Sequence, residues 1–494
     1  MPINEYYLLI KQKGLHHAWI EMMNFLEING IKKFEKKFFK ISEIGHYYEI
    51  GLAYISKTNK KNLGKYYTPS DVAKLMSKML LRCKNINSIA DTGCGCGNLI
   101  IEFLNALKKQ NKSIFNNVVN NIYLFDTDKT ALMICKTKIR AIFGKHIVPI
   151  IKCGDFLNSK NQLPGNCCVI ANPPYSIVRS FKSTWKNLPA LKQSHDLYAG
   201  FIEKIIRKCT AAVIVSPQSF LVSSKFSILR NLLSKNCNGE IYSFDNVPST
   251  IFSGKKEGIF NSNTSNGVRA SISYLVKKTP NSKQKGFKLS HLIRFKSSER
   301  AKVLNIKYLQ KQLGKKYQNL QKPLKCFAEY EHFVYSIIEK NNILLKDIIS
   351  VAPTDYAVCI NSSSRYFTVA TKTDLKRNGK YFIYAKDKKS FYILYSLLNS
   401  SYCYLFWRMM DGGILFNKSI LLNTPLPKLV LTKEIRTYVD NMIEHEKEFF
   451  VYKKNAGLNQ QSVKFPKKYR EKLNSMLFTD KIDFNLLHMN HEII

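Results

Sequence analysis

The sequence predicts an α/β fold in which helices cover both faces of a mostly parallel sheet. Between residues 63 and 278, seven short β-type runs alternate with helical segments, as in successive βα units. Four consecutive runs also end in Asp, Gly or Asn, residues suited to a binding crevice at the carboxyl edge of such a sheet. The seven runs are SIADTG, NIYLFD, VPIIKCGD, CCVIANPPY, AAVIVSP, EIYSFD and ASISYLVKK.

The last two runs have no long helix between them, so we expect one antiparallel edge strand. The 494 residues are too many for one average domain. We therefore expect a helical N-terminal segment (1–62), the α/β domain (63–278), a basic linker or docking surface (279–325) and a separate domain (326–494). The sequence has no run of about 18 apolar residues and no secretory signal pattern, which favours a cytoplasmic protein.

Charge is the strongest signal in the composition. Lys and Arg number 77 against 35 Asp and Glu, a formal net charge of +42. An AT-rich genome would account for part of this excess, because its codons favour Lys and Asn. It would not remove acids, and residues 277–325 hold 15 basic residues and one acid, Glu299. The excess therefore predicts a nucleic-acid partner and makes 279–325 a candidate DNA-contacting region.

The cysteines and histidines give little support for a metal site. The twelve cysteines look reduced, and no second Cys/His pair stands at zinc-finger spacing. The ten histidines are scattered without a His-Glu-x-x-His motif. We expect no bound metal.

The four strand tips carry the candidate cofactor residues. The first tip is Asp91-Thr92-Gly93-Cys94-Gly95-Cys96-Gly97, whose glycines let a ligand approach the backbone. Taken alone, this motif also fits a nicotinamide site, a flavin site or a simple tight turn. Asp126 ends the second run, where ribose hydroxyls bind in such folds. The next two tips are Gly154-Asp155-Phe156 and Asn172-Pro173-Pro174-Tyr175.

The segment Gly64–Ala73, GKYYTPSDVA, precedes the first strand. Thr68 suits an N-cap, Pro69 a first helical position and Asp71 a capping-box position, so a well-capped helix is one reading. Asp128 likewise suits the cap of the helix that follows Asp126.

Five motifs of this chain, taken in order, resemble those of the DNA adenine-N6 amino-methyltransferases of restriction–modification systems, in the class whose Tyr-Thr-Pro motif comes first. The motifs are GKYYTPSDVAKLM, DTGCGCGNL, FDTD, GDF and NPPY. The resemblance covers about residues 65–278 and implies a Rossmann-like methyltransferase sheet, S-adenosyl-L-methionine as cofactor, and a C-terminal target-recognition domain. Cys96 stands where the commoner glycine motif has Thr, and Thr92 departs from its usual Pro; we expect cofactor binding to survive both.

The resemblance also implies roles for individual residues. Tyr67 and Thr68 would pack on the methionine part of the cofactor, and Asp91, beside Gly93 and Gly95, would face its ammonium group. Asp126 would bind the ribose hydroxyls. Asp155 and Phe156 would read and stack on the adenine.

The Asn-Pro-Pro-Tyr run carries the predicted chemistry. Asn172 Oδ1 and the Pro173 carbonyl can accept hydrogen bonds from an exocyclic amine and direct its lone pair at a methyl group. Pro173 and Pro174 stiffen the turn, and Tyr175 can stack on the target ring. The base must leave the duplex, so we expect base flipping. No cysteine is assigned as a nucleophile.

Within the family, Asn at the position of Asn172 goes mostly with adenine N6 and Ser with cytosine N4. By the same resemblance, Phe252 in the segment Ile251–Lys256 would cover the other face of the base, although a core position is equally compatible. His195, in the family-like segment His195–Tyr198, is expected to be scaffold or to border the pocket.

The C-terminal run YSLLNSSYCYLFWRMMDGGILFNKSILLNTPLP resembles the recognition region of these enzymes and of restriction specificity subunits. The overlapping segment FYILYSLLNSSYCYLFWRMM predicts one helix. Arg365, Arg377 and Arg408 are possible base readers, and solvated or phosphate-binding roles are alternatives.

The predicted function is therefore site-specific methylation of adenine N6 in double-stranded DNA, which protects it from a separately encoded restriction endonuclease, by an enzyme acting as a monomer on DNA. An RNA or protein-glutamine amino-methyltransferase with the same Asn-Pro-Pro-Tyr chemistry is one alternative. A methylase–nuclease fusion or a non-enzymatic DNA-binding specificity protein is the other. The first 62 residues leave no room for a nuclease domain, and a pure binding protein would not need the cofactor motifs.

Overall fold

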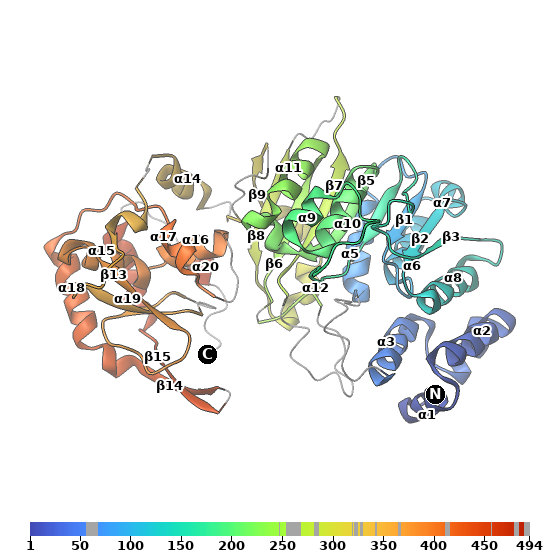
Figure 1. The fold of residues 1–494 in the computed structure, drawn as a ribbon, viewed down its shortest axis with the longest axis horizontal. Helices are drawn as coiled ribbons and strands as arrows, with labels where there is room; N and C mark the ends of the chain where they lie inside the picture. The colour runs from blue at the N-terminus through green and yellow to red at the C-terminus, as the bar shows by residue number, and fades with distance from the viewer. Residues whose placement is uncertain are drawn as a thin grey trace. The chain divides into compact units, whose positions relative to one another are not determined.

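The computed structural model describes two compact units, Met1–Pro323 (unit 1) and Leu324–Ile494 (unit 2), which we treat separately (Figure 1). None of the described helices combines the length and apolar character needed to cross a bilayer. The described residues are 1–55, 68–246, 248–252, 268–280, 286–318, 320, 325–326, 330–340, 343–363, 367–410, 415–455, 457–478 and 484–488.

Unit 1 begins with helices α1 (Ile3–Lys13), α2 (Leu15–Lys37) and α3 (Ile44–Ile55). They share a core centred on Tyr6 and Trp19, whose rings meet edge to face at 6.2 Å. The same core includes Ala131 and Ile134 of α8 (Lys129–Phe143), so the N-terminal helices pack directly on the α/β domain.

A nine-stranded sheet forms the centre of unit 1, in the order β3-β2-β1-β4-β5-β7-β6-β8-β9. All seven predicted strands are present. Strands β3, β2, β1, β4 and β5 are parallel neighbours, while β7 runs antiparallel to both β5 and β6. Their bounds are β1 (Ile89–Thr92), β2 (Ile122–Asp126), β3 (Ile150–Cys153), β4 (Cys168–Ala171), β5 (Ala211–Pro217), β6 (Cys237–Phe244) and β7 (Ala270–Lys277).

Helices cover both faces of this sheet, as predicted. Alternate residues of each strand enter opposite cores; Ile89 belongs to one and Ala90 to the other. One face packs on α5 (Ser70–Leu80), α6 (Asn98–Gln110) and α7 (Lys112–Val118). The other packs on α9 (Pro189–Ser194), α10 (Leu197–Ile206) and α11 (Ser227–Asn236), which lie together in Figure 1.

The expectation of a linker after residue 278 is wrong for the described part of 279–325. Strand β8 (Phe287–Ile293) pairs parallel with β6, and β9 (Leu313–Tyr317) pairs antiparallel with β8 (Figure 1). The antiparallel strand β7 is therefore interior, and β9 is the antiparallel edge strand. The cause is alternation within the basic stretch: Phe287 and Leu289 are buried, whereas Lys288 between them is exposed.

Unit 2 has its own core and a small antiparallel sheet in the order β10-β13-β11-β12. The single helix expected over 391–410 is two helices, α15 (Lys388–Asn399) and α16 (Tyr402–Met410). Ser400 between them is extended, and its Oγ accepts a hydrogen bond from the Tyr402 amide at 3.1 Å. The other elements are α14 (Glu331–Lys340), β10 (Ile349–Ser350), β11 (Ala357–Asn361), β12 (Ala370–Thr371), β13 (Lys380–Ala385), α17 (Lys418–Leu422), α18 (Lys433–Glu444), β14 (Phe450–Asn455), β15 (Leu458–Val463), α19 (Lys467–Leu477) and α20 (Asn485–His488).

Candidate active site

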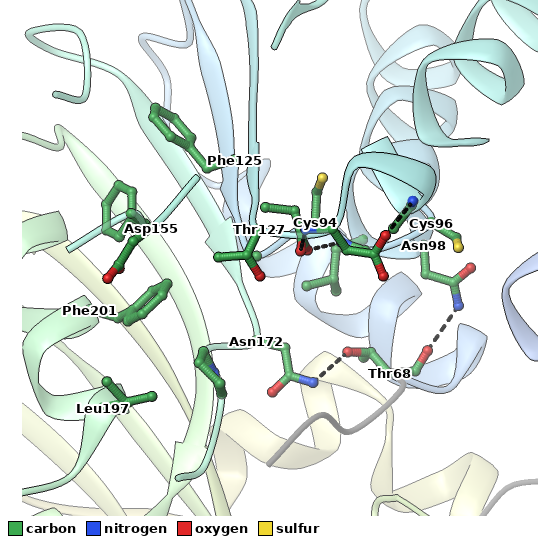
Figure 2. Close-up of a pocket in the computed structure, with 18 of the residues that line it drawn as sticks. Thr68, Cys94, Cys96, Asn98, Phe125, Thr127, Asp155, Asn172, Leu197 and Phe201 are labelled. Atoms are coloured by element: carbon green, nitrogen blue, oxygen red, sulfur yellow. Dashed lines mark hydrogen bonds between the residues drawn. The ribbon is translucent and has the colours of Figure 1, made fainter. Parts of the chain in front are cut away.

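The carboxyl ends of β1, β2, β3 and β4 surround a cavity of about 430 Å³, a size typical of cofactor pockets (Figure 2). This is the edge at which open parallel sheets bind ligands. Most residues predicted from the strand tips line it. They are Thr68, Gly93, Gly95, Asp126, Asp155, Phe156, Asn172 and Pro174.

The glycine turn leads from β1 into α6 through backbone conformations that suit glycine. Gly93, Gly95 and Gly97 have φ angles of 124°, 48° and 84°. A Cβ on Gly97 would lie 2.5 Å from the Cys135 Sγ, whereas one on Gly95 would meet no atom of a described residue within 4 Å. Gly97 is therefore required by packing, and Gly95 leaves open space for a ligand beside the backbone.

Asp91 lies on β1 and is fully buried, so it is not among the side chains that line the cavity. Neither carboxylate oxygen accepts a hydrogen bond of ordinary geometry from a described residue. Burial raises its pKa well above the usual range, the nearby charge of Asp126 raises it further, and the Ile100 amide opposes the shift. A cation next to this carboxyl would stabilise its charged form.

Asp126, at the end of β2, holds the glycine turn in place. Its Oδ2 accepts a hydrogen bond from the Gly95 amide at 2.8 Å and its Oδ1 one from the Asp128 amide at 2.9 Å. Asp128 caps α8 as predicted, because its Oδ1 accepts from the Thr130 and Ala131 amides. The carboxylate of Asp126 thus fixes the glycine turn while lining the cavity.

Asp155 and Phe156 form the far wall. Asp155 Oδ2 accepts hydrogen bonds from the Trp185 indole at 2.7 Å and from Lys182 Nζ at 3.1 Å. The Phe156 ring packs between Phe125 and Phe201, with centroids 5.2 and 5.0 Å away. This wall combines a flat apolar surface with polar atoms at its rim, as an adenine ring requires.

Behind this wall, Lys204 supports the turn. Its Nζ donates to the Phe156 carbonyl at 2.5 Å and the Asn158 carbonyl at 2.7 Å, and lies 4.8 Å from the centre of the Phe156 ring. Burial lowers the pKa of Lys204 to about 8.

Asn172 follows β4 directly, and its Nδ2 donates to Thr68 Oγ1 at 3.0 Å (Figure 2). The Thr68 carbonyl accepts from Asn98 Nδ2 at 3.0 Å. Helix α5 begins at Ser70 with Pro69 as its N-cap, so the reading of Thr68 as the cap is wrong. Its hydroxyl contacts Asn172 instead. Tyr67 lies outside the described residues.

Pro173 is buried and Tyr175 half-buried. The rings of Tyr175 and Phe252 meet at a centroid distance of 6.1 Å and an interplanar angle of 65°. Phe252 is 7% exposed and belongs to the core on the α5 face, so the two readings of this residue are compatible. Residues 253–256 of its segment lie outside the described residues. His195 ends α9 and stacks edge-on against Phe181 at 5.1 Å, away from the cavity lining.

Sequence reasoning missed two groups of lining residues. The first is one face of α3, which contributes Gly45, Tyr48, Glu49 and Leu52; Tyr48 donates its hydroxyl to Asp128 Oδ2 at 2.8 Å. Their spacing is that of one helix face, which the sequence shows, but the sequence does not show what that face packs on. The second group follows β4 and comprises Lys182, Trp185, Leu197 and Phe201.

In unit 2, the structure describes two of the three candidate base readers, and they lie in different environments. Arg408 is 4% exposed and packs inside the unit 2 core, so the possibility that it reads bases is wrong. Arg377 is half-buried beside β15 and donates to the Gln461 carbonyl at 3.4 Å. Arg365 lies outside the described residues.

Several known proteins are similar to this chain. A type I restriction enzyme MpnII methylase subunit of Mycoplasma pneumoniae is 24% identical over 172 residues, 32% of this chain and 30% of that protein. The type II methyltransferase M.VspI of Vibrio sp. is 31% identical over 122 residues, 24% of this chain and 28% of that protein. The matched regions thus span less than a third of these relatives.

Among solved structures, one of a class I S-adenosylmethionine-dependent methyltransferase from Listeria monocytogenes aligns with a TM-score of 0.42 at 17% identity, covering 58% of this chain and 90% of that one. A modification subunit of a type I restriction enzyme from Vibrio vulnificus aligns with a TM-score of 0.38 at 16% identity, covering 62% and 61%. The family model described as N-6 DNA Methylase matches residues 40–326, from α3 through the cavity to the end of unit 1, and the chain therefore belongs to the N-6 DNA methylase family.

Proposed function

We propose that this chain transfers a methyl group from S-adenosyl-L-methionine to the N6 amino group of adenine within a short sequence of double-stranded DNA. The observation that carries this proposal is the position of Asn172. Its amide lines the cavity, held by Thr68, and the stiff Pro173–Pro174 turn follows it. Family membership supports the same reaction.

The cavity fits the proposed cofactor in shape and in chemistry. Asp126, at the tip of β2, would bind the ribose hydroxyls, and Asp155 with Phe156 would hold the adenine. Asp91 would face the ammonium group, a cation that offsets the unfavourable burial of its carboxyl. When bound there, the cofactor supplies the electrophilic methyl group.

The chain's own residues would prepare the target amine. The hydrogen bond from Asn172 Nδ2 to Thr68 Oγ1 fixes the orientation of the amide. Oδ1, on the other side of the amide, is then the atom that would meet the target amine. Oδ1 and the Pro173 carbonyl would accept the two amine protons and direct the nitrogen lone pair toward the methyl group. This chemistry depends on positioning and needs no covalent intermediate.

A duplex adenine reaches this site only by flipping out of the helix. Tyr175 and Phe252 would then stack on the extruded base. The formal charge of +42 supports binding to the phosphate backbone. The basic residues of 279–325 would contact phosphates, and side chains of unit 2 would select the sequence. We further propose that the enzyme works in the cytoplasm, as a monomer on DNA, opposite a separately encoded restriction endonuclease.

The test is methyl transfer with labelled cofactor to unmethylated DNA, to RNA and to a peptide release factor, each in a separate reaction. Asn172→Ala should lower transfer to DNA by about 10²-fold or more, as expected for the loss of one preorganised hydrogen-bonding group. Its affinity for the cofactor should change little. Asn120→Ala is the matched control, because this exposed amide lies just before β2 at the opposite edge of the sheet.

Label recovered as N6-methyladenine, and lost only in Asn172→Ala, supports the proposal. Label found only in RNA or in protein glutamine would show that the substrate is RNA or protein and not DNA. Equal activity of Asn172→Ala and the wild type would refute the role of the amide.

A further inference from the structure

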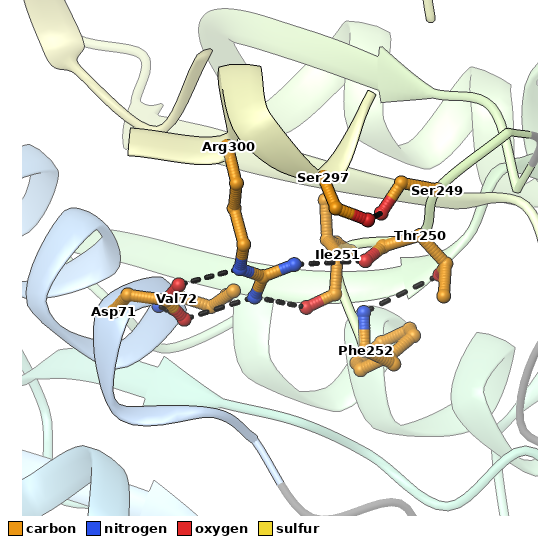
Figure 3. Close-up of polar contacts among 8 residues, drawn as sticks. All are labelled: Asp71, Val72, Ser249, Thr250, Ile251, Phe252, Ser297 and Arg300. Atoms are coloured by element: carbon orange, nitrogen blue, oxygen red, sulfur yellow. Dashed lines mark hydrogen bonds and ion pairs between the residues drawn. The ribbon is translucent and has the colours of Figure 1, made fainter. Parts of the chain in front are cut away.

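Arg300, at the start of α12 (Arg300–Val303), connects two parts of the site that are far apart in the sequence (Figure 3). Its Nε and Nη2 donate to the Asp71 carboxylate at 2.6 and 2.9 Å. Its Nη1 donates to the Thr250 carbonyl and its Nη2 to the Ile251 carbonyl, both at 2.8 Å. One guanidinium therefore binds the first turn of α5 and the backbone just before Phe252.

We propose that Arg300 is a positioning residue for the aromatic wall, the pair Tyr175 and Phe252 that would stack on the flipped base. This inference rests on the proposed function. It assigns a role inside the catalytic unit to one of the basic residues of 279–325, which the sequence suggested for DNA contacts.

The arrangement uses properties that only arginine has. A planar fork can serve a carboxylate with two nitrogens while the same group reaches two carbonyls, whereas a lysine ammonium offers one nitrogen. The Arg300 side chain is 16% exposed and that of Asp71 45%. Because Asp71 is so exposed, its charge attraction is weakened by solvent, and the geometry of the fork is the main contribution.

The same contacts tie the aromatic wall to the residue that binds the amine. Asp71 lies three positions after Thr68, whose hydroxyl accepts the hydrogen bond from Asn172. Arg300 thus joins the segment that orients Asn172 to the segment that carries Phe252. A shift of either segment would change the position of the ring relative to the amide.

Arg300 also determines how the wall can open. The Tyr175 and Phe252 rings are 6.1 Å apart at 65°, whereas a base stacked between two parallel rings needs about 7 Å, twice a carbon–carbon contact distance. The backbone before Phe252 is held at Thr250 and Ile251, and the Phe252 amide donates to Thr250 Oγ1 at 3.3 Å. Admission of the base therefore requires reorientation of at least one of the two rings, and Phe252 would turn on a backbone held in place by Arg300.

The test compares Arg300→Lys and Arg300→Gln with Arg82→Lys. Arg82 is a matched control because it makes a similar two-nitrogen pair with Glu240, beyond the other end of α5 and away from the cavity. Three quantities are measured: steady-state methylation of the mapped site, cofactor affinity, and fluorescence of 2-aminopurine placed at the target position.

Both Arg300 variants should lower kcat by roughly 10- to 100-fold, the scale expected when a reacting group is misplaced by about 1 Å. KM for DNA and cofactor affinity should stay within about twofold, and 2-aminopurine should become brighter because the flipped base is less well stacked. Thermal stability should fall no further than in Arg82→Lys, which should keep its kcat.

A kcat within twofold of the wild type in Arg300→Gln, or losses that match those of Arg82→Lys, would overturn the role of Arg300 and leave the proposed function intact. If the wild-type chain methylates no DNA under conditions where it binds the cofactor, the proposed function fails, and the inference about Arg300 fails with it.

Discussion

Replacing Gly97 with alanine should destabilise unit 1 far more than the same change at Gly95. Gly97 has a φ of 84°, and a Cβ there would lie 2.5 Å from the buried Cys135 Sγ. The left-handed backbone should cost about 1–2 kcal/mol and the overlap about 1–3 kcal/mol, together about 2–5 kcal/mol. Gly95 has a φ of 48°, and no atom in the described part of the chain lies within 4 Å of a Cβ there, so it should show only the backbone cost of about 1–2 kcal/mol.

The two variants should differ in the opposite sense in cofactor binding. A methyl group on Gly95 enters the cavity, whereas Gly97 does not line it. Titration calorimetry should therefore show weaker binding in Gly95→Ala than in Gly97→Ala. The free energy of unfolding is measured by urea denaturation in a Trp407→Phe background, so that the fluorescence reports only Trp19 and Trp185 of unit 1.

A double-mutant cycle with Cys135→Ala isolates the overlap. Removing the Sγ should recover about 1–3 kcal/mol in the Gly97→Ala background, as a coupling energy between contacting residues. Equal destabilisation by Gly95→Ala and Gly97→Ala, or no coupling to Cys135, would refute the argument that packing imposes this glycine.

Three further predictions concern residues that support the site or unit 2. Tyr48→Phe removes the hydrogen bond to Asp128 Oδ2 and should weaken cofactor binding about 2- to 10-fold, the equivalent of about 0.5–1.5 kcal/mol. An unchanged cofactor affinity in calorimetry would show that the α3 wall, the face of α3 that lines the cavity, does not contribute to binding. The folded-state pKa of Lys204 is about 8, below its ordinary value near 10.4, so the unfolded chain binds more protons across this interval and stability should rise from pH 8 to pH 10. Lys204→Met should abolish that part of the rise in urea titrations at each pH, and an unchanged slope would contradict it. Glu446 is fully buried and accepts hydrogen bonds from the Lys372 and Thr373 amides. Glu446→Gln should cost unit 2 about 1–3 kcal/mol, because an amide NH₂ replaces one acceptor; thermal unfolding is followed by Trp407 fluorescence in a Trp19→Phe, Trp185→Phe background, and an unaltered midpoint would argue against it.

The sequence predicted those parts of the fold in which local pattern and tertiary role agree. The central strands are apolar on both faces and end in Asp, Gly or Asn, so their existence, order and shared edge could all be predicted. For the same reason, Asp126, Asp155 and Asn172 could be placed at one cavity before the structure was known.

Where charge and pattern conflicted, prediction failed. The alternation of Phe287, Lys288 and Leu289 is typical of a strand, but it lies in a stretch whose basic composition favours a linker. Thr68 and Pro69 form a plausible capping pair, and only the tertiary hydrogen bond to Asn172 shows that the hydroxyl serves another purpose.

The α3 wall could not be predicted, because sequence gives the face of a helix but not what it faces. Gly45, Tyr48, Glu49 and Leu52 are spaced as one face, and such a face is usually read as one that packs on a core. Their place beside the cofactor cavity depends on how α2 and α3 dock on α8, which is a long-range arrangement.

The pairing of β8 with β6 has a practical consequence for dissecting this protein into fragments. A fragment that stops at residue 278 would leave the backbone N–H and C=O groups along the outer side of β6 without partners, on a strand whose residues are all buried in the full chain. Exposed apolar strand edges recruit other chains, so such a fragment should form aggregates during expression. A fragment carried through β9 would keep this edge covered and end at a short strand rich in lysine.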